Sequence, residues 1–295
     1  MPLGWHVWTN CRFRSGDLTS GADLAGVRVG EGNPVVIVGV LNTSPDSFYA
    51  GSVVKSPAEA VKRARHMLDD GADIIDVGAM STAPGVKPIP VGLERRRLLP
   101  MVEALVKKLD SPISIDTQRA EIARAALNAG ARIINDVSGL KADPEMTRVL
   151  ADFGCSAVLM AARQKPGDVR TIDEIKHELG KSLRMCERHG IDLKKIVIDP
   201  GIGFGKGAEW DLYILANLRR LAALGCPICV AVSRKSFIGK VLDLPDPAGR
   251  LWGSLAATAI AVLNGADVIR THDPKETLYA VRLAESVRSA GKPKS

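Results

Sequence analysis

The sequence predicts a parallel α/β protein, a (β/α)8 TIM barrel with a short N-terminal extension. Eight short apolar runs alternate with helical patterns, and continuous apolar runs are typical of strands buried on both faces of a parallel sheet. Three runs share one Gly-Ala frame, at residues 71–77, 130–136 and 265–272. Nearly every run is followed by polar residues. In such a barrel these would meet on the carboxyl-terminal face, where the chemistry takes place.

The chain divides into an irregular, glycine-rich extension or hairpin at 1–34, the barrel at 35–290 and a polar tail at 291–295. We expect strands where the apolar runs lie, at 35–41, 73–77, 113–115, 132–135, 156–160, 196–198, 228–232 and 267–269. Helical periodicity fills the segments between them, at 57–70, 93–109, before 129, and at 144–153, 173–189, 210–224, 253–264 and 274–290. Pro57 suits a first helical turn, Gly71 ends that helix, and Pro100 is expected to kink or split the second helix.

An open doubly wound sheet is the competing architecture. No Gly-x-Gly-x-x-Gly turn follows the first strand, which disfavours a dinucleotide-binding fold. The glycine run at 201–205 follows the sixth strand and lacks that spacing.

Composition narrows the class of protein. The chain has 295 residues, 46% of them hydrophobic, with no apolar run near the roughly 18 residues of a membrane span and no signal-peptide core. The five cysteines are scattered, so we expect a reducing, cytoplasmic setting, and Cys226-x-x-Cys229 is expected to be structural. The net charge of +7 fits a solvated basic surface or an anionic substrate. With only 4% aromatic residues, stacking platforms for nucleic acid are poorly supported.

Polar residues at four strand ends predict the first half of a site. Asn42 ends the first strand, and its amide oxygen can bind a hard cation such as Mg2+. Asp116, Asn135 and Asp199 end the third, fourth and sixth strands. One such residue is often a helix cap, but three at one barrel mouth suit a neutral heterocycle rich in N–H donors, such as a guanine-like or pterin ring.

The last two strands carry the opposite charge. The seventh strand is followed by Ser233, Arg234, Lys235 and Ser236, and the eighth by Arg270 and His272. Barrels commonly bind phosphate with these two loops, and Arg and Lys are the usual phosphate partners. The mouth therefore suits a polar fused ring that carries a diphosphate.

With these motifs the chain resembles the dihydropteroate synthases, among the pterin-binding barrels, from about residue 33 to 290. The similar segments are 41–48, 114–117, 135–139, 199–206, 233–239 and 270–273. The resemblance implies a homodimeric enzyme that joins 6-hydroxymethyl-7,8-dihydropterin diphosphate to p-aminobenzoate and releases diphosphate, with Mg2+ as cofactor. It also implies an early-ionising displacement driven mostly by electrostatics, because a neutral arylamine needs no strong general base.

The resemblance also assigns roles to individual residues. It implies that Asp116, Asn135, Asp199 and Lys235 hold the pterin and that Met160 and Phe204 line its pocket. Asn42 would bind the Mg2+ carried by the diphosphate, and Arg270 and His272 would clamp the diphosphate, with Lys235 beside them. The arylamine would lie against Phe48, Thr82, Pro84, Ser233 and Ser236.

The loop after the second strand departs from the family pattern. It has Met80 and Ala83 where Glu and Arg are usual, and Ala161-Ala162 stand where a His often follows Met160. This version is more like the branch that uses a ribofuranosyl phosphate arylamine in methanopterin synthesis, which remains an alternative acceptor. A corrinoid methyltransferase domain and a non-catalytic pterin-binding protein are further alternatives. Residues 233–236 with Arg270 and His272 argue against the methyltransferase domain, which needs no diphosphate clamp. The intact Asn42, Lys235, Arg270 and His272 count against lost chemistry.

Overall fold

Eight parallel strands form a barrel in the computed structural model, which describes residues 21–30, 32–44, 51, 53–80, 86–164 and 167–290. The strand order is β8-β7-β6-β5-β4-β3-β10-β9, and a parallel bridge between Ile198 and Ile228 brings the two ends together. The predicted TIM barrel is therefore confirmed. The strands are β3 Val36–Asn42, β4 Ile74–Gly78, β5 Ile113–Asp116, β6 Ile133–Asp136, β7 Ser156–Met160, β8 Ile196–Asp199, β9 Cys229–Val230 and β10 Val268–Thr271.

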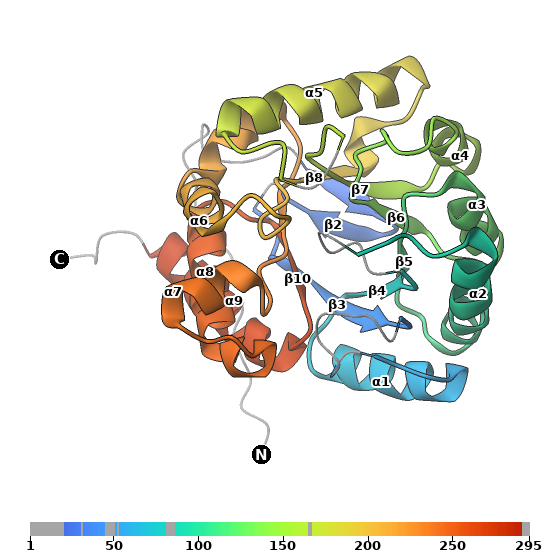
Figure 1. The fold of residues 1–295 in the computed structure, drawn as a ribbon, viewed down its shortest axis with the longest axis horizontal. Helices are drawn as coiled ribbons and strands as arrows, with labels where there is room; N and C mark the ends of the chain where they lie inside the picture. Colours follow the sequence, from blue (N-terminus) through green and yellow to red (C-terminus); the bar gives the residue numbers. More distant parts are fainter. Residues whose placement is uncertain are drawn as a thin grey trace.

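The helices follow one another around the barrel in chain order (Figure 1). They are α1 Pro57–Asp69, α2 Val91–Lys108, α3 Ala120–Asn128, α4 Met146–Phe153, α5 Ile172–Arg188, α6 Ala208–Ala216, α7 Ser236–Leu242, α8 Leu251–Leu263 and α9 Pro274–Ser289, with short 3-10 turns η2 Leu193–Lys195, η3 Leu218–Leu224 and η4 Pro247–Arg250. Local sequence explains their starts. Ser56 caps α1 by accepting from the Glu59 amide, and Thr171 and Glu174 form a capping box on α5.

Three helix predictions need correction. The expected helix at 210–224 is α6 followed by the 3-10 turn η3. The helix α7 was not predicted, because seven residues are too few for a clear helical period. The helix α2 runs unbroken through Pro100, so packing of its apolar face outweighs the loss of one backbone hydrogen bond.

The core has two parts. Most buried apolar residues lie between the strands and the surrounding helices. A second cluster fills the barrel itself, and residues of an antiparallel hairpin, β1 Ala22–Leu24 and β2 Val27–Val29, pack into it. Leu24 and Val29 are fully buried there. The hairpin lies within the predicted extension and covers the amino-terminal end of the strands, which leaves the carboxyl-terminal end for a ligand.

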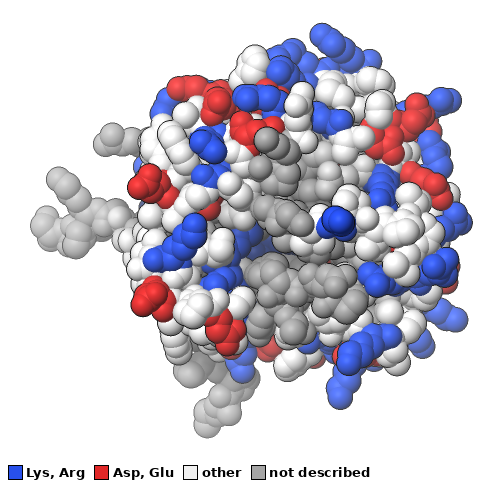
Figure 2. All heavy atoms as spheres, viewed as in Figure 1, with Lys and Arg blue, Asp and Glu red and all other residues white. Residues whose placement is uncertain are grey.

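Both signs of charge are present on the face of the molecule that Figure 2 shows. There, Lys and Arg side chains are distributed around the molecule with Asp and Glu among them. On this face the distribution fits a solvated surface better than a concentrated basic patch. In the described part of the chain no helix is long and apolar enough to cross a membrane. Cys155, Cys186, Cys226 and Cys229 are buried thiols without a disulfide, as expected for a structural Cys226-x-x-Cys229.

Candidate active site

Three charged side chains meet at the centre of the barrel mouth. Arg270, on β10, donates from Nε to Asp76 Oδ2 at 2.7 Å and from Nη2 to Asp116 Oδ2 at 3.0 Å. Asp76 and Asp116 come from β4 and β5 and are buried. One guanidinium therefore faces two carboxylates, and the group carries a net negative charge when both are ionised.

Asp76 organises this cluster, and the sequence analysis did not identify it. Its carboxylate accepts from Ser114 Oγ at 2.6 Å and from Asn135 Nδ2 at 3.4 Å, besides Arg270. The signal was present in the 71–77 frame, where an Asp interrupts a buried apolar run. The strand-end rule passed over Asp76, because it lies within β4 and not at its end.

Asp116 is poised to accept a hydrogen bond. Its Oδ1 is buried and has no hydrogen-bond partner within the described residues, an arrangement that costs free energy until a donor arrives. Burial raises the pKa of Asp116 to about 7; Arg270 opposes the rise and the neighbouring Asp76 adds to it. Near neutral pH this carboxyl group is therefore present in both forms, and its ionised form can accept a hydrogen bond from a ligand N–H.

A loop rich in glycine supplies the next part of the site, directly after β8. Asp199 ends β8 and accepts from the Gly201 amide at 2.6 Å. Lys235 reaches across from the β9 side, donates to the Ile202 carbonyl and lies 4.3 Å from the centre of the Phe204 ring. Burial lowers the pKa of Lys235 to about 8, and the nearby Asp199 works against that decrease.

Glycine at position 203 is required by this packing. Gly203 has a φ of +78°, and an added Cβ would lie 2.1 Å from Cδ of Lys235. A side chain here would be strained and would displace the lysine. The loop sequence and the position of Lys235 thus depend on each other.

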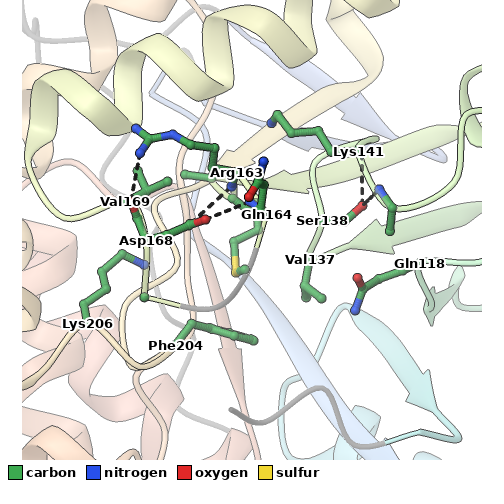
Figure 3. Close-up of a pocket in the computed structure, with 15 residues that line it drawn as sticks. Gln118, Val137, Ser138, Lys141, Arg163, Gln164, Asp168, Val169, Phe204 and Lys206 are labelled. Atoms are coloured by element: carbon green, nitrogen blue, oxygen red, sulfur yellow. Dashed lines mark hydrogen bonds between the residues drawn. The ribbon is translucent and has the colours of Figure 1, made fainter. Parts of the chain in front are cut away.

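A cavity of about 350 Å3 opens beside this loop. Figure 3 shows Phe204 and Lys206 on one side of it and Val137 and Gln118 on the other. Met160 also lines the cavity. Apolar and aromatic walls with a few polar groups are usual for small-molecule sites, and this one is large enough for a flat bicyclic ring.

The loops after β9 and β10 touch through Ser233 and His272. Ser233 Oγ lies 3.0 Å from His272 Nδ1 and accepts from the His272 amide at 3.3 Å. Burial, followed by the positive charges of Arg270 and Arg234, lowers the pKa of His272 to about 3. His272 is therefore a neutral imidazole at physiological pH, which can donate one hydrogen bond but adds no positive charge.

Comparisons with known proteins agree with this geometry. Residues 38–272 match the family described as pterin binding enzyme. The dihydropteroate synthase of Synechocystis is 40% identical over 87% of this chain and 91% of its own length, and that of Bacillus subtilis is 38% identical over 87% and 90%. The chain belongs to this family.

Solved structures place it among the dihydropteroate synthases of the family. The Yersinia pestis enzyme, solved in a sulfonamide drug complex, superposes with a TM-score of 0.84 at 33% identity over 92% of this chain and all of that one. The Xanthomonas albilineans enzyme, solved with 4-aminobenzoic acid, gives 0.82 at 35% identity over the same shares. These relatives favour a dihydropteroate synthase over the methanopterin-type enzyme, the methyltransferase domain and the non-catalytic protein.

The barrel brings most of the predicted site residues of this dihydropteroate synthase to one mouth. Asp116, Asn135, Asp199 and Lys235 border it, with Met160 and Phe204 at the cavity. Arg270 is bound to carboxylates rather than standing apart from them. Ser236 begins α7. Phe48, Thr82 and Pro84 lie outside the described residues.

Arg234, one of the two cations that follow the seventh predicted strand, has its guanidinium bound within the protein. Its guanidinium binds Asp273 and two carbonyl groups, because its backbone adopts a φ of +57° that sends the side chain into the loops. No pattern in the sequence signalled that conformation.

Asn42 ends β3 beside Gly78, its partner on β4. A Cβ built at Gly78 would lie 3.6 Å from Asn42 Oδ1 and 3.7 Å from Asp116 Oδ2, so the glycine keeps open the space between these oxygens. Among the described residues, no group of three or more His, Cys, Asp or Glu is arranged to hold a metal. The single amide oxygen fits an Mg2+ ion that takes its other ligands from a substrate and water.

Proposed function

We propose that this enzyme condenses 6-hydroxymethyl-7,8-dihydropterin diphosphate with p-aminobenzoate to give 7,8-dihydropteroate and diphosphate, in folate biosynthesis. The observation that carries the proposal is the buried acceptor set of Asp116, Asn135 and Asp199 beside Lys235, in a chain of dihydropteroate synthase type. Related enzymes have been solved with 4-aminobenzoic acid and with pteroic acid, which supports both halves of the reaction.

The pterin is held by groups of complementary polarity. Asp116 Oδ1, which has no hydrogen-bond partner among the described residues, accepts a ring N–H. Asp199 keeps one carboxylate oxygen on the Gly201 amide and offers the other to the amino group and ring N–H of the pyrimidine. Met160 and Phe204 enclose the ring and exclude water, which strengthens these hydrogen bonds.

The diphosphate lies toward β3 and β10. Asn42 would hold Mg2+ there, and the metal supplies charge neutralisation to the departing diphosphate. Arg270 presents five N–H donors, and the bonds to Asp76 and Asp116 use two of them. His272, neutral in this setting, donates a hydrogen bond from the imidazole nitrogen that does not face Ser233.

The reaction is a displacement at the pterin methylene carbon. The C–O bond breaks and the diphosphate leaves with the electron pair, while the electron-rich dihydropterin and the nearby carboxylates stabilise the positive charge on carbon. The arylamine nitrogen then forms the new C–N bond and loses a proton to solvent. The arylamine enters from the side bordered by Ser233, in the loop after β9, and by Ser236, the first residue of α7.

The enzyme acts as a homodimer in the cytoplasm under this proposal. Exposed apolar side chains concentrate on α7, α8 and α9, where Trp252 is 77% exposed and Leu283 68% exposed; the others are Val241, Leu242, Ile260, Tyr279 and Val287. A patch of large apolar residues on a soluble protein usually marks a protein interface, and a second copy of the same chain is the partner that this proposal names.

Diphosphate release from the pterin substrate with Mg2+ tests the function, with p-aminobenzoate or the ribofuranosyl phosphate arylamine as acceptor. We expect turnover with p-aminobenzoate, reduced at least about 100-fold in Asn42→Ala and in Arg270→Ala because each removes stabilisation of the leaving group. Near-normal turnover in both variants would sink the mechanism. Turnover with the phosphorylated acceptor alone would move the enzyme to methanopterin synthesis.

A further inference from the structure

The backbone pairing between two neighbouring strands of the barrel is short next to the active site. Strands β9 and β10 share only two residue pairs, Cys229 with Val268 and Val230 with Ile269. The backbone ladder between them therefore stops before it reaches Lys235 and His272, the residues that act on the substrate. Side chains must fix the separation of these two loops.

A buried ion pair connects the two loops beyond the end of this pairing. Arg234 donates to Asp273 through two parallel bonds, Nε to Oδ2 and Nη2 to Oδ1, both 2.8 Å long. The side chain of Arg234 is 6% exposed and that of Asp273 is 14% exposed. The pair directly flanks the working residues, since Arg234 precedes Lys235 and Asp273 follows His272. Planar, bidentate pairing fixes orientation as well as distance.

Both ends of the pair are anchored in turn. The amide of Arg234 donates to Ser254 Oγ at 2.8 Å, and Arg250 donates to the carbonyl of Arg234 at 3.1 Å. The amide of Asp273 donates to Thr271 Oγ1 at 3.1 Å. The left-handed φ of Arg234, +57°, is costly for a residue with a Cβ. Such strain persists where the surroundings over-determine the backbone, most often at functional sites.

We propose that Arg234 and Asp273 are positioning residues that hold Lys235 and His272 at the separation required by a pterin on one side and its diphosphate on the other, an inference that rests on the proposed function. Lys235 has further support from Ile202 and Phe204. The loop of His272 meets the β9 loop through Ser233 and this ion pair. Loosening the pair therefore affects the diphosphate end more than the pterin end.

Calorimetric titration with two probes separates these ends, using 6-hydroxymethyl-7,8-dihydropterin diphosphate with Mg2+ and 6-hydroxymethyl-7,8-dihydropterin without a diphosphate. In Asp273→Asn and Arg234→Lys we expect affinity for the diphosphate to fall at least about tenfold and affinity for the alcohol to change less than about threefold, since both variants keep the side-chain volume but lose bidentate pairing. The control is Glu285→Gln, which weakens a contact with the Val35 amide at the opposite end of the barrel and should leave both affinities unchanged.

A second comparison tests whether the pair acts through His272. In a His272→Ala background, Asp273→Asn should reduce diphosphate affinity by less than about threefold, because residues that act as one unit are not additive. Equal losses for both probes, unchanged affinities or full additivity would each overturn the inference. If the unmodified chain binds both probes but releases no diphosphate with p-aminobenzoate, the proposed function fails and the binding comparison still decides this inference.

Discussion

Arg270 and Asp76 are joined by a 2.7 Å hydrogen bond across the barrel mouth, although 194 residues separate them in the chain. The bond connects β10 to β4, two strands that do not pair with each other but lie on either side of β3. It fixes the guanidinium so that its second contact is Asp116. The charge balance of the proposed pterin pocket therefore depends on Asp76 as well as on Asp116.

Replacing Asp76 by Asn should weaken the contact that holds the Arg270 guanidinium between Asp76 and Asp116. Arg270 loses a charged partner and moves away from its present position, and a small misplacement of a binding group can cost about 100-fold in rate. We expect turnover to fall about 10- to 100-fold while the fold is retained in circular dichroism. Asp73→Asn is the control, since Asp73 lies just before β4 and its carboxylate accepts from the Ile37 amide. Similar activity in the two variants would contradict the role of Asp76.

The affinity for pterin should depend on pH with a maximum between about 7 and about 8. Below the raised pKa of Asp116, about 7, binding of a ring N–H must first displace a proton, so affinity approaches a tenfold loss per pH unit. Above the lowered pKa of Lys235, about 8, the ammonium loses its charge. Titration with 6-hydroxymethyl-7,8-dihydropterin across this range measures both limbs. In Asp116→Asn the loss of affinity below a pH of about 7 should disappear. If the same loss remains in this variant, another group is responsible for it.

Gly203→Ala should weaken pterin binding, because the new Cβ would displace Lys235. Gly207→Ala is a matched control, since Gly207 also has a positive φ, +94°, but an added Cβ there meets nothing within 4 Å. Both changes should lower the melting temperature through backbone strain of about 1–2 kcal/mol. Calorimetry should then show reduced pterin affinity in Gly203→Ala alone. Equal affinities would mean that Lys235 can be displaced without loss.

Trp252→Glu should convert a dimer to a monomer. The side chain is 77% exposed on α8, and a charge buried in the proposed apolar interface is unfavourable unless it is paired. Analytical ultracentrifugation gives the mass directly. Phe153→Glu, on α4 and 37% exposed, is the control away from α7, α8 and α9. A dimer that survives Trp252→Glu would place the interface elsewhere.

The strands were the most predictable part of the fold, for a physical reason. A strand buried on both faces is mostly apolar, as in β7, where four apolar residues follow Ser156 and the observed bounds match the expected 156–160. Helix α7 escaped prediction because a single short helix leaves little periodic pattern. A hairpin was one expectation for residues 1–34, but its bounds were not predicted, because β1 and β2 have only three residues each, too few for a reliable alternation of polar and apolar residues.

Strand-end polarity located much of the candidate site but not its internal partners. The rule that selected Asp116, Asn135 and Asp199 identifies residues that face the mouth. It cannot tell which of two cations, Arg234 or Arg270, turns toward the mouth, since that depends on a backbone angle in one loop. Nor can it reveal that Arg270 is shared between two carboxylates. Such pairings depend on the closure of the barrel and not on nearby sequence.

The single bridge between Ile198 and Ile228 has a consequence for the dynamics of the enzyme. Local opening of a fold begins where few hydrogen bonds join neighbouring segments, so amide hydrogen exchange near this junction should be faster than in β3, β4 or β6. Asp199 lies on one side of the junction and Lys235 on the other. A pterin bound to both residues would connect the two ends of the sheet at this junction. Protection of its amides from hydrogen exchange should therefore increase when the substrate binds.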